Sequence, residues 1–365
     1  MKNLNLIIFA LLIIKSVFSY SQSINKEEYL KNNSFDIKDK LLFNDNLVYL
    51  AGEIHYSKGN YDNSKTIIEH LSIESNKKVI IIFELPYNRE LYFNKFFLIG
   101  DTTSLNILAE DTYLVDEFKK NMWELKKIRD SQMNKFEIKC IDIAKNLRNA
   151  FSNIERLINE DDLNLPAFIK FLKFNNRKYM SKWKAKKMLL ELREESSRNE
   201  TTYKSYFGEN YNEFQRQIDA GLILFSGFNT KTSESMESRE QFLYNNCKRI
   251  IEENKDCILF GQFGQAHIPL LYQKNWLHLN NWSSLAARLN SDSNSPVKGK
   301  VTSMVYFYKT DYIQNSYFEP IIKSEDVPVF MKYSNSPFTI FKLDAPETPF
   351  KEMSEKYQYL IINKY

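Results

Sequence analysis

The stretch that decides the fold is LVYLAGEIH, residues 47–55, an apolar run that ends in a glycine and two ionisable side chains. Three later stretches are also strand-like; they are VIIIFE (79–84), FEIKCID (136–142) and CILFGQFGQAH (257–267). Apolar runs of this length are typical of strands that are buried on both faces, from which parallel sheets are built. Each stretch therefore predicts a strand of a central sheet, with polar residues at its carboxyl end.

Helical patterns separate these strands. Apolar residues recur at spacings of three and four over 61–74 and 114–128, and a long helix is expected over 233–253. The alternation of strands and helices predicts an α/β fold with a mostly parallel central sheet flanked by helices. The segment from about 145 to 232 has helical patterns without a convincing strand, which predicts a helical insertion. Further strands are expected at 301–308, 338–343 and 357–362.

The composition excludes several classes of protein. The 365 residues are 43% hydrophobic and 26% charged, as in a globular protein, which argues against a disordered chain and a polytopic membrane protein. The 50 Lys and Arg against 46 Asp and Glu leave a net charge of only +4, so no nucleic-acid partner is expected. Three cysteines are too few for a disulfide scaffold.

The first 21 residues have the pattern of an export signal. Lys2 precedes an apolar run over 4–14 that is shorter than the ~20 residues of a membrane-spanning helix. Small residues then precede Gln22, which predicts cleavage there; the alternative is an uncleaved anchor. We therefore expect an exported protein, periplasmic or secreted, in which 22–365 form a single α/β domain and no stable membrane span remains.

Two of the four histidines follow predicted strands. His55 comes just after the first strand and His267 just after the fourth, and Gly52 and Gly264 stand close by. Glycine allows backbone conformations and close approaches that other residues resist, so both segments are expected to be shaped, substrate-binding loops. Open α/β sheets bind ligands just past the carboxyl ends of their strands. Both histidines are therefore candidate site residues.

Two glutamates add the carboxylates that such a site needs. Glu53 and His55 are two residues apart, so in extended backbone both side chains face the same side, and Glu84 ends the neighbouring apolar run. A carboxylate beside an imidazole raises its basicity and fixes its tautomer, as in sites that activate water. The predicted catalytic residues are thus Glu53, His55, Glu84 and His267.

Two other interpretations stay open at this stage. Two imidazoles with one or two carboxylates also suit a divalent metal such as zinc or manganese, and the sequence leaves the metal undecided. In the structural interpretation, Glu53 and Glu84 cap helix N-termini and the histidines only satisfy hydrogen bonds. Asp142, at the end of the third strand, either lines the same edge or begins the next helix.

The same residues carry a family resemblance. Their order along the chain is LAGEIH (50–55), FE (83–84), Arg239 on a helix, and GQAH (264–267). This order resembles the superfamily that contains the erythromycin esterases, the ChaN-like haem-uptake proteins and the TraB/TIKI proteases. The resemblance covers roughly residues 45–90 and 233–290, with the helical middle unmatched.

The resemblance implies roles for these residues and a function. Glu53 and His55 would activate water with support from Glu84. Arg239 and His267 would bind a substrate oxyanion or complete the site. The expected function is that of an exported hydrolase that cleaves an ester, a lactone or a similar bond of a small molecule. The alternative is a non-catalytic protein that binds haem or a metal with the same two histidine loops; the histidine pattern fits a divalent metal better than haem.

Overall fold

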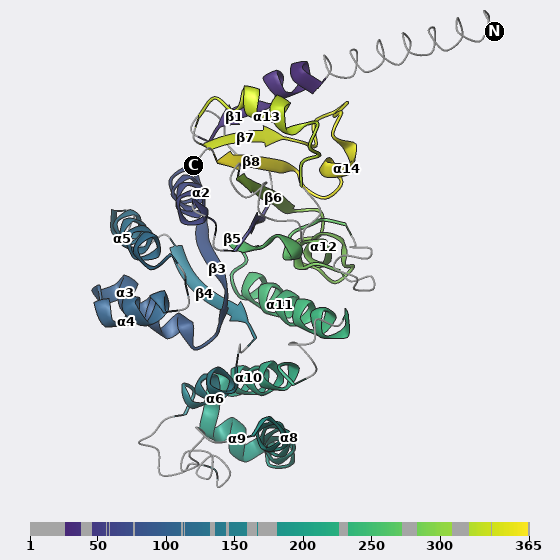
Figure 1. Ribbon diagram of the computed structural model, residues 1–365. Helices are drawn as coiled ribbons and strands as arrows, with labels where there is room; N and C mark the ends of the chain where they lie inside the picture. Colours follow the sequence, from purple (N-terminus) through teal and green to yellow (C-terminus); the bar gives the residue numbers. More distant parts are fainter. Residues whose placement is uncertain are drawn as a thin grey trace, which may run out of the picture.

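Figure 1 shows the protein in a computed structural model. The structure describes residues 26–37, 46–55, 57, 59–75, 77–110, 112, 114–131, 136–143, 146–158, 166, 181–225, 233–271, 283–308, 321–336 and 338–363. The expected export signal, residues 1–21, lies outside the described residues and stays a prediction. Within the described part of the chain, no helix is both long and apolar enough to cross a membrane.

An eight-stranded sheet forms the centre of the described structure, in the order β1-β7-β8-β6-β2-β5-β3-β4. Its strands are β1 (Ser34–Asp36), β2 (Val48–Glu53), β3 (Lys78–Pro86), β4 (Phe136–Asp142), β5 (Cys257–Gly264), β6 (Val301–Tyr308), β7 (Phe338–Lys342) and β8 (Tyr359–Asn363). Every neighbouring pair from β8 to β4 is parallel, whereas β7 and β1 add an antiparallel edge. The predicted α/β fold with a mostly parallel sheet is confirmed.

Helices cover both faces of this sheet. On one face lie α2 (Asn60–Glu74), α3 (Arg89–Ile99), α4 (Thr102–Ala109) and α5 (Val115–Ser131). The opposite face is covered by α11 (Ser233–Glu253), α12 (Leu285–Ser291), α13 (Val327–Tyr333) and α14 (Lys351–Ser354). Figure 1 shows α3, α4 and α5 on one side of β3, β4 and β5 and α11 and α12 on the other, with α13 and α14 near β7 and β8. The chain therefore folds into three layers, as the strand and helix patterns predict.

The central strands are apolar on both faces because each face packs against its own helices. In β2, Val48 and Leu50 contribute to the core beneath α11 and α12, whereas Tyr49 and Ala51 contribute to the core beneath α2. All four side chains are fully buried. Continuous apolar runs are the sequence signature of this arrangement, and it explains why the run at 47–51 identifies the sheet.

A third core lies within a group of helices away from the sheet, at the lower end of Figure 1. The group consists of α6 (Leu147–Glu155), α8 (Lys182–Arg198), α9 (Glu200–Phe207) and α10 (Tyr211–Ile223), with the short 3₁₀ helix η2 (Gly208–Asn210) between the last two. Its centre is aromatic: Phe207 and Phe214 stack with ring centroids 4.2 Å apart. Most of the described residues of the expected insertion thus lie in helices, and its limits near 145 and 232 stay predictions.

The order of the strands could not be read from the sequence. The strands that carry Glu53 and Glu84 share the same sheet edge, and β5 lies between them. The physical reason is that β5 pairs with both through long-range contacts, and local patterns do not specify which strands become neighbours.

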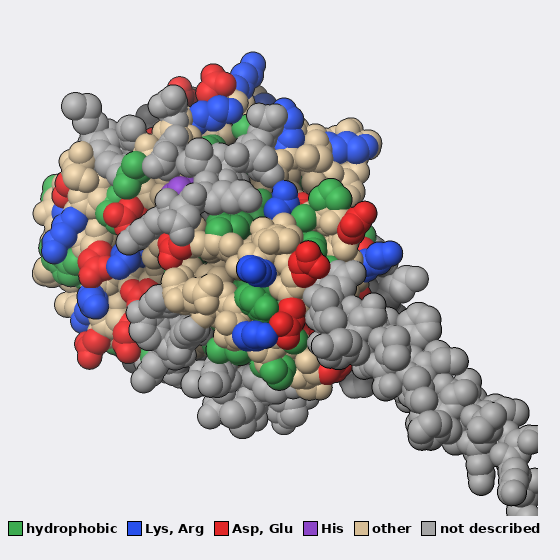
Figure 2. Space-filling model, turned by 90° about the horizontal axis from the view of Figure 1, so that it is seen from above, with side chains coloured by type: hydrophobic (Ala, Val, Ile, Leu, Met, Phe, Trp, Pro, Cys, Tyr) green, Lys and Arg blue, Asp and Glu red, His purple; other side chains and the backbone are tan. Residues whose placement is uncertain are grey.

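The charges on the surface agree with the small net charge of the chain. In Figure 2, described side chains of both signs are interspersed over the face shown.

Candidate functional site

The carboxyl ends of the parallel strands bring the predicted residues together. Glu53 ends β2, Glu84 lies near the end of β3, and Gly264 ends β5. The 3₁₀ helix η4 (Gln265–His267) follows β5 directly and carries His267. Arg239 reaches the same edge from α11 and bonds to Glu84, as described below. Open α/β sheets bind their ligands at this edge, just past the carboxyl ends of the parallel strands, and we call it the ligand edge.

His55 and Glu53 form a pair that faces solvent. The Nδ1 atom of His55 lies 2.9 Å from Oε1 of Glu53. The side chain of His55 is 50% exposed and that of Glu53 is 16% exposed. The amide of Gln262, on β5, donates a hydrogen bond to the other carboxylate oxygen of Glu53. Gln262 therefore holds one oxygen of Glu53, while the other oxygen orients the imidazole of His55. Because the carboxylate can only accept, Nδ1 of His55 carries the proton and Nε2 is the basic nitrogen.

The position of His55 depends on the glycine beneath it. A Cβ atom at Gly264 would come within 2.9 Å of Nε2 of His55, closer than real Cβ contacts allow. The backbone N–H of Gly264 donates to Oε2 of Glu84 over 2.9 Å. Gly264 thus brings the His55 ring close to the Glu84 carboxylate.

The pKa of His55 is shifted in the direction that suits a base. Its hydrogen bond to Glu53 raises the pKa above the ordinary value of 6.5, and this outweighs the opposing effect of partial burial. The negative charge of Glu84 adds to the increase. A more basic imidazole accepts a proton from water more readily, which is the requirement for general-base catalysis near neutral pH.

Behind this pair lies a buried cluster centred on Arg239. Its guanidinium binds Asp142 through two hydrogen bonds, Nε to Oδ1 over 2.9 Å and Nη2 to Oδ2 over 2.6 Å. Nη2 also donates to Glu84, and Nη1 lies 3.1 Å from Nε2 of His267. The side chains of Arg239 and Asp142 are only 9% and 2% exposed. Asp142 lines the site edge, so of its two expected positions this one is correct.

His267 is paired with a glutamate that the motifs did not identify. Its Nδ1 atom bonds to Glu240, which follows Arg239 on α11, and the two side chains are 4% and 0% exposed. Burial lowers the pKa of His267, but the carboxylates of Glu240 and Glu84 outweigh it and raise that pKa to about 10. Arg239 opposes this increase, but at a pKa of about 10 His267 is protonated at neutral pH, with Nδ1 facing Glu240 and Nε2 lying 3.4 Å from Oε1 of Glu84.

Glu84 is held as a carboxylate by the same cluster. Burial raises its pKa, but the positive charges of His267 and Arg239 outweigh this effect and hold the pKa well below its ordinary value. Glu84 is then unable to donate a proton near neutral pH. It connects the two halves of the site, because it accepts from Arg239 and from the Gly264 backbone beneath His55.

The donor set does not fit a resident metal ion. Among the described residues, no group of three or more histidine, cysteine and acidic side chains could hold a metal. At the predicted site, two of the candidate ligands already contact a cationic side chain, because Arg239 donates to Glu84 and lies 3.1 Å from Nε2 of His267. Haem binding is untested by these contacts and stays a prediction.

Three residues expected to bind substrate have other contacts in the structure. A Cβ atom at Gly52 would lie 2.5 Å from Cγ1 of Ile268, so this glycine allows η4 and the residue after it to pack on β2. The backbone N–H of Gly264 donates a hydrogen bond to Glu84, and the absence of a side chain on its Cα leaves room for the ring of His55. Arg239 is buried with its guanidinium bonded to carboxylates. These contacts of all three residues are therefore with other residues of the chain.

Two residues of the site escaped the sequence analysis. Glu240 gave a weak signal, because it stands next to the singled-out Arg239, but only the rotation of α11 shows that it faces His267. Gln262 lies between two glycines in β5, and its neutral side chain carries no catalytic signal of its own. One oxygen of each side chain, Oε2 of Glu240 and Oε1 of Gln262, is buried without a hydrogen-bond partner among the described residues.

Comparison with known proteins places the fold. No protein-family model matches the sequence, and no curated protein matches it. Three of the solved structures that match share a TM-score near 0.6 with this chain. A mutant of the erythromycin esterase EreC in its open conformation has a TM-score of 0.59 and 10% identity, covering 87% of this chain and 90% of the esterase. A Bacillus cereus protein has a TM-score of 0.62 and 12% identity, covering 94% of this chain and 97% of its own.

The third structure is described as a succinoglycan biosynthesis protein; it has a TM-score of 0.63 and 9% identity and covers 94% of this chain and 97% of its own. Identities this low establish a shared fold and leave the chemistry to the residues of this chain. This chain therefore shares its fold with an erythromycin esterase, as the resemblance in four short motifs implies.

Proposed function

We propose that this protein is a hydrolase that uses water to cleave an ester, a lactone or a similar bond of a small molecule. The observation that carries the proposal is the His55–Glu53 pair: an imidazole that is half exposed at the ligand edge, with a carboxylate on its Nδ1 atom. The fold shared with an erythromycin esterase supports the same class of reaction.

The geometry suggests how the residues act. Nε2 of His55 accepts a proton from a water molecule, whose oxygen attacks the carbonyl carbon of the substrate. Glu53 stabilises the imidazolium that forms, and Gln262 keeps Glu53 in place. The imidazolium then returns its proton to the leaving oxygen as the carbon–oxygen bond breaks, so that the acid and the alcohol are released and the imidazole is restored.

In this proposal the buried cluster positions the pair and does not contact the substrate. Glu84 is fixed by Arg239 and in turn binds the backbone of Gly264, on which His55 rests. His267, which is bonded to Glu240, contacts the guanidinium of Arg239 and so helps to hold it in place. Of the four predicted catalytic residues, Glu53 and His55 are assigned to the chemistry, and Glu84 and His267 to support.

The substrate class is tested with the full chain and a panel of p-nitrophenyl acetate, p-nitrophenyl butyrate and a macrolide lactone. Replacing the base, as in His55→Ala, is expected to lower kcat/KM for any accepted substrate by about 10²- to 10⁴-fold. His70→Ala, on helix α2, is the matched control and should leave kcat/KM unchanged. Retained turnover in His55→Ala, with folding confirmed by circular dichroism, would overturn the proposal.

Export is also part of the proposal, on the evidence of residues 1–21. Cell fractionation of the full chain should find it outside the cytoplasm, and deletion of 2–21 should retain it inside. An equal distribution of both forms would contradict this.

The alternative function, haem binding by the two histidine loops, predicts a Soret shift in a haem titration that is lost in His55→Ala.

A further inference from the structure

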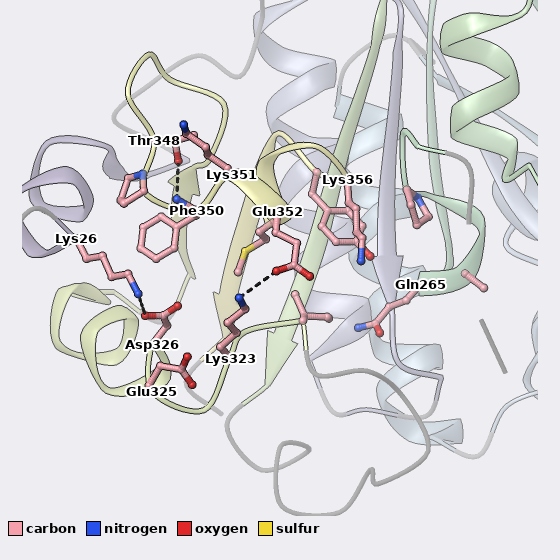
Figure 3. A pocket seen from close by; sticks show the side chains of 16 residues that line it. Lys26, Gln265, Lys323, Glu325, Asp326, Thr348, Phe350, Lys351, Glu352 and Lys356 are labelled. Carbon is pink, nitrogen blue, oxygen red and sulfur yellow. Dashed lines mark hydrogen bonds and ion pairs between the residues drawn. The ribbon is translucent and has the colours of Figure 1, made fainter. Parts of the chain in front are cut away.

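A cavity of about 410 Å³ lies beside the proposed hydrolytic site (Figure 3). Gln265 and Ala266 of η4 line one side of it, and the segments around α13 and α14 line the other. The side chains of His55, Glu53 and Glu84 do not line it. Its volume falls within the range of roughly 300–1,000 Å³ that is usual for small-molecule pockets.

The inner lining of the cavity is apolar and firmly held. Phe350, Met353 and Tyr357 contribute side chains that are nine-tenths or more buried. The ring of Phe350 packs against that of Phe330, with centroids 4.7 Å apart. The backbone N–H of Leu270 donates to the carbonyl of Lys356 over 2.9 Å, which ties the chain after η4 to the chain after α14. The cavity is thus formed by anchored segments, with aromatic rings against which an apolar ligand could pack.

Charged side chains surround this lining. Four lysines and three acidic residues lie around the cavity, a surplus of one positive charge: Lys26, Lys323, Lys351, Lys356, Glu325, Asp326 and Glu352. Figure 3 shows the two ion pairs among them. The pair of Lys26 and Asp326 is largely buried, with side chains 25% and 8% exposed and atoms 2.6 Å apart. It belongs to the framework of the pocket.

The second ion pair differs from the first because it is exposed. Nζ of Lys323 lies 3.0 Å from Oε2 of Glu352, and the side chains are 61% and 68% exposed. Exposed pairs of this kind contribute little to stability, because water competes with both partners. Another anion that is held by additional apolar contacts can therefore displace Glu352 from Lys323 at little cost.

We propose that this cavity binds an amphipathic organic anion. The apolar or aromatic body of the ligand packs against Phe350 and Tyr357, and its carboxylate or sulfonate replaces Glu352 as the partner of Lys323. This is a binding activity beyond the proposed hydrolysis, since the cavity uses neither the base nor its carboxylate. In this arrangement Lys323 attracts the ligand and Glu352 competes with it.

The test is a fluorescence titration of the full chain with 8-anilinonaphthalene-1-sulfonate, an aromatic anion. One saturable site is expected. Lys323→Ala removes the anion partner and should weaken binding about two- to fivefold, the loss expected for an ion pair at an exposed lysine. Glu352→Gln removes the competitor and should tighten binding about two- to fivefold. Opposite changes from the two members of one ion pair are not expected from a general loss of stability.

A matched exposed pair on α9 provides the control. Lys204 and Glu200 lie 2.7 Å apart with side chains 58% and 54% exposed, so Lys204→Ala and Glu200→Gln should leave binding unchanged. The proposal is overturned if no saturable site is found, if Lys323→Ala and Glu352→Gln change affinity in the same direction or not at all, or if the α9 variants have equal effects. His55→Ala should bind the probe like the unmodified chain, so a failure of the hydrolase proposal would leave this result intact.

Discussion

Two histidine–glutamate pairs lie at the same edge of the sheet and differ mainly in burial. His55 and Glu53 are 50% and 16% exposed, whereas His267 and Glu240 are 4% and 0% exposed. In both pairs Nδ1 contacts the carboxylate, and in both the carboxylate raises the pKa of the imidazole. The same chemical unit therefore occurs once in contact with water and once in the interior.

The difference between the pairs shows how environment assigns a role. The exposed imidazole can exchange its proton with a water molecule or a substrate, as a general base must. The buried imidazole is surrounded by Glu240, Glu84 and Arg239, and its charge is needed to balance the carboxylates. A buried charge that loses its partner is strongly destabilising. The buried pair should therefore matter for stability, and the exposed pair for turnover.

The largest effect on stability is expected when the centre of the buried cluster is removed. Arg239→Met would leave Glu84 and Asp142 as buried carboxylates without their cation, at a cost of about 3–5 kcal/mol in the free energy of unfolding. Arg198→Met, in an exposed pair on α8, is the control and should cost less than about 1 kcal/mol. Urea denaturation measures both. Equal stability of the two variants would show that the buried cluster is not a structural unit.

The stability conferred by His267 should depend on pH with a definite sign. Its folded-state pKa of about 10 lies above its ordinary value of 6.5, so its contribution is fully present below pH 6.5 and is lost as the pH rises toward 10. The difference in unfolding free energy between the unmodified chain and His267→Gln should therefore shrink between these two pH values. For Arg198→Met the difference should stay constant, because arginine remains charged throughout. A difference for His267→Gln that grows with pH would refute the protonated state.

Substitution of two glycines is expected to have smaller effects, one on activity and the other on stability. In Gly264→Ala the new methyl group would push on the His55 ring, and a small displacement of a base is expected to reduce kcat/KM about tenfold with little loss of stability. In Gly52→Ala the methyl group would meet Ile268 instead, which should cost about 1–3 kcal/mol of stability with kcat/KM nearly retained. Parallel unfolding and activity measurements distinguish them. If both variants lose only stability, Gly264 does not position His55.

Much of the framework of this site could be predicted from the sequence. The strands at 136–142 and 301–308 and the helix at 233–253 have the expected bounds. Strong apolar runs and helical periodicity carry this information locally. Because carboxyl ends of parallel strands share an edge, Glu53, Glu84 and His267 could be expected at one site before their contacts were known.

The rest depended on long-range packing. The place of β5 between β2 and β3 follows from pairing partners far apart in the chain. The burial of Arg239, expected to contact substrate, follows from Asp142 at the end of β4, 97 positions away. Glu240 faces His267 because of the way α11 lies over the sheet edge. Motifs identify which residues meet, but they do not show which of them remain accessible to water.

The most direct test of this division is a titration of both imidazoles in the full chain by NMR with isotopically labelled histidine. His55→Ala and His267→Gln provide the assignments. His55 should titrate with a pKa above 6.5 that falls in Glu53→Gln, because the hydrogen bond to Glu53 is the main cause of the increase. His267 should remain protonated until about pH 10. A His267 that titrates near neutral pH, or a His55 whose pKa is unchanged in Glu53→Gln, would contradict the division of the two pairs into an open base and a buried cation.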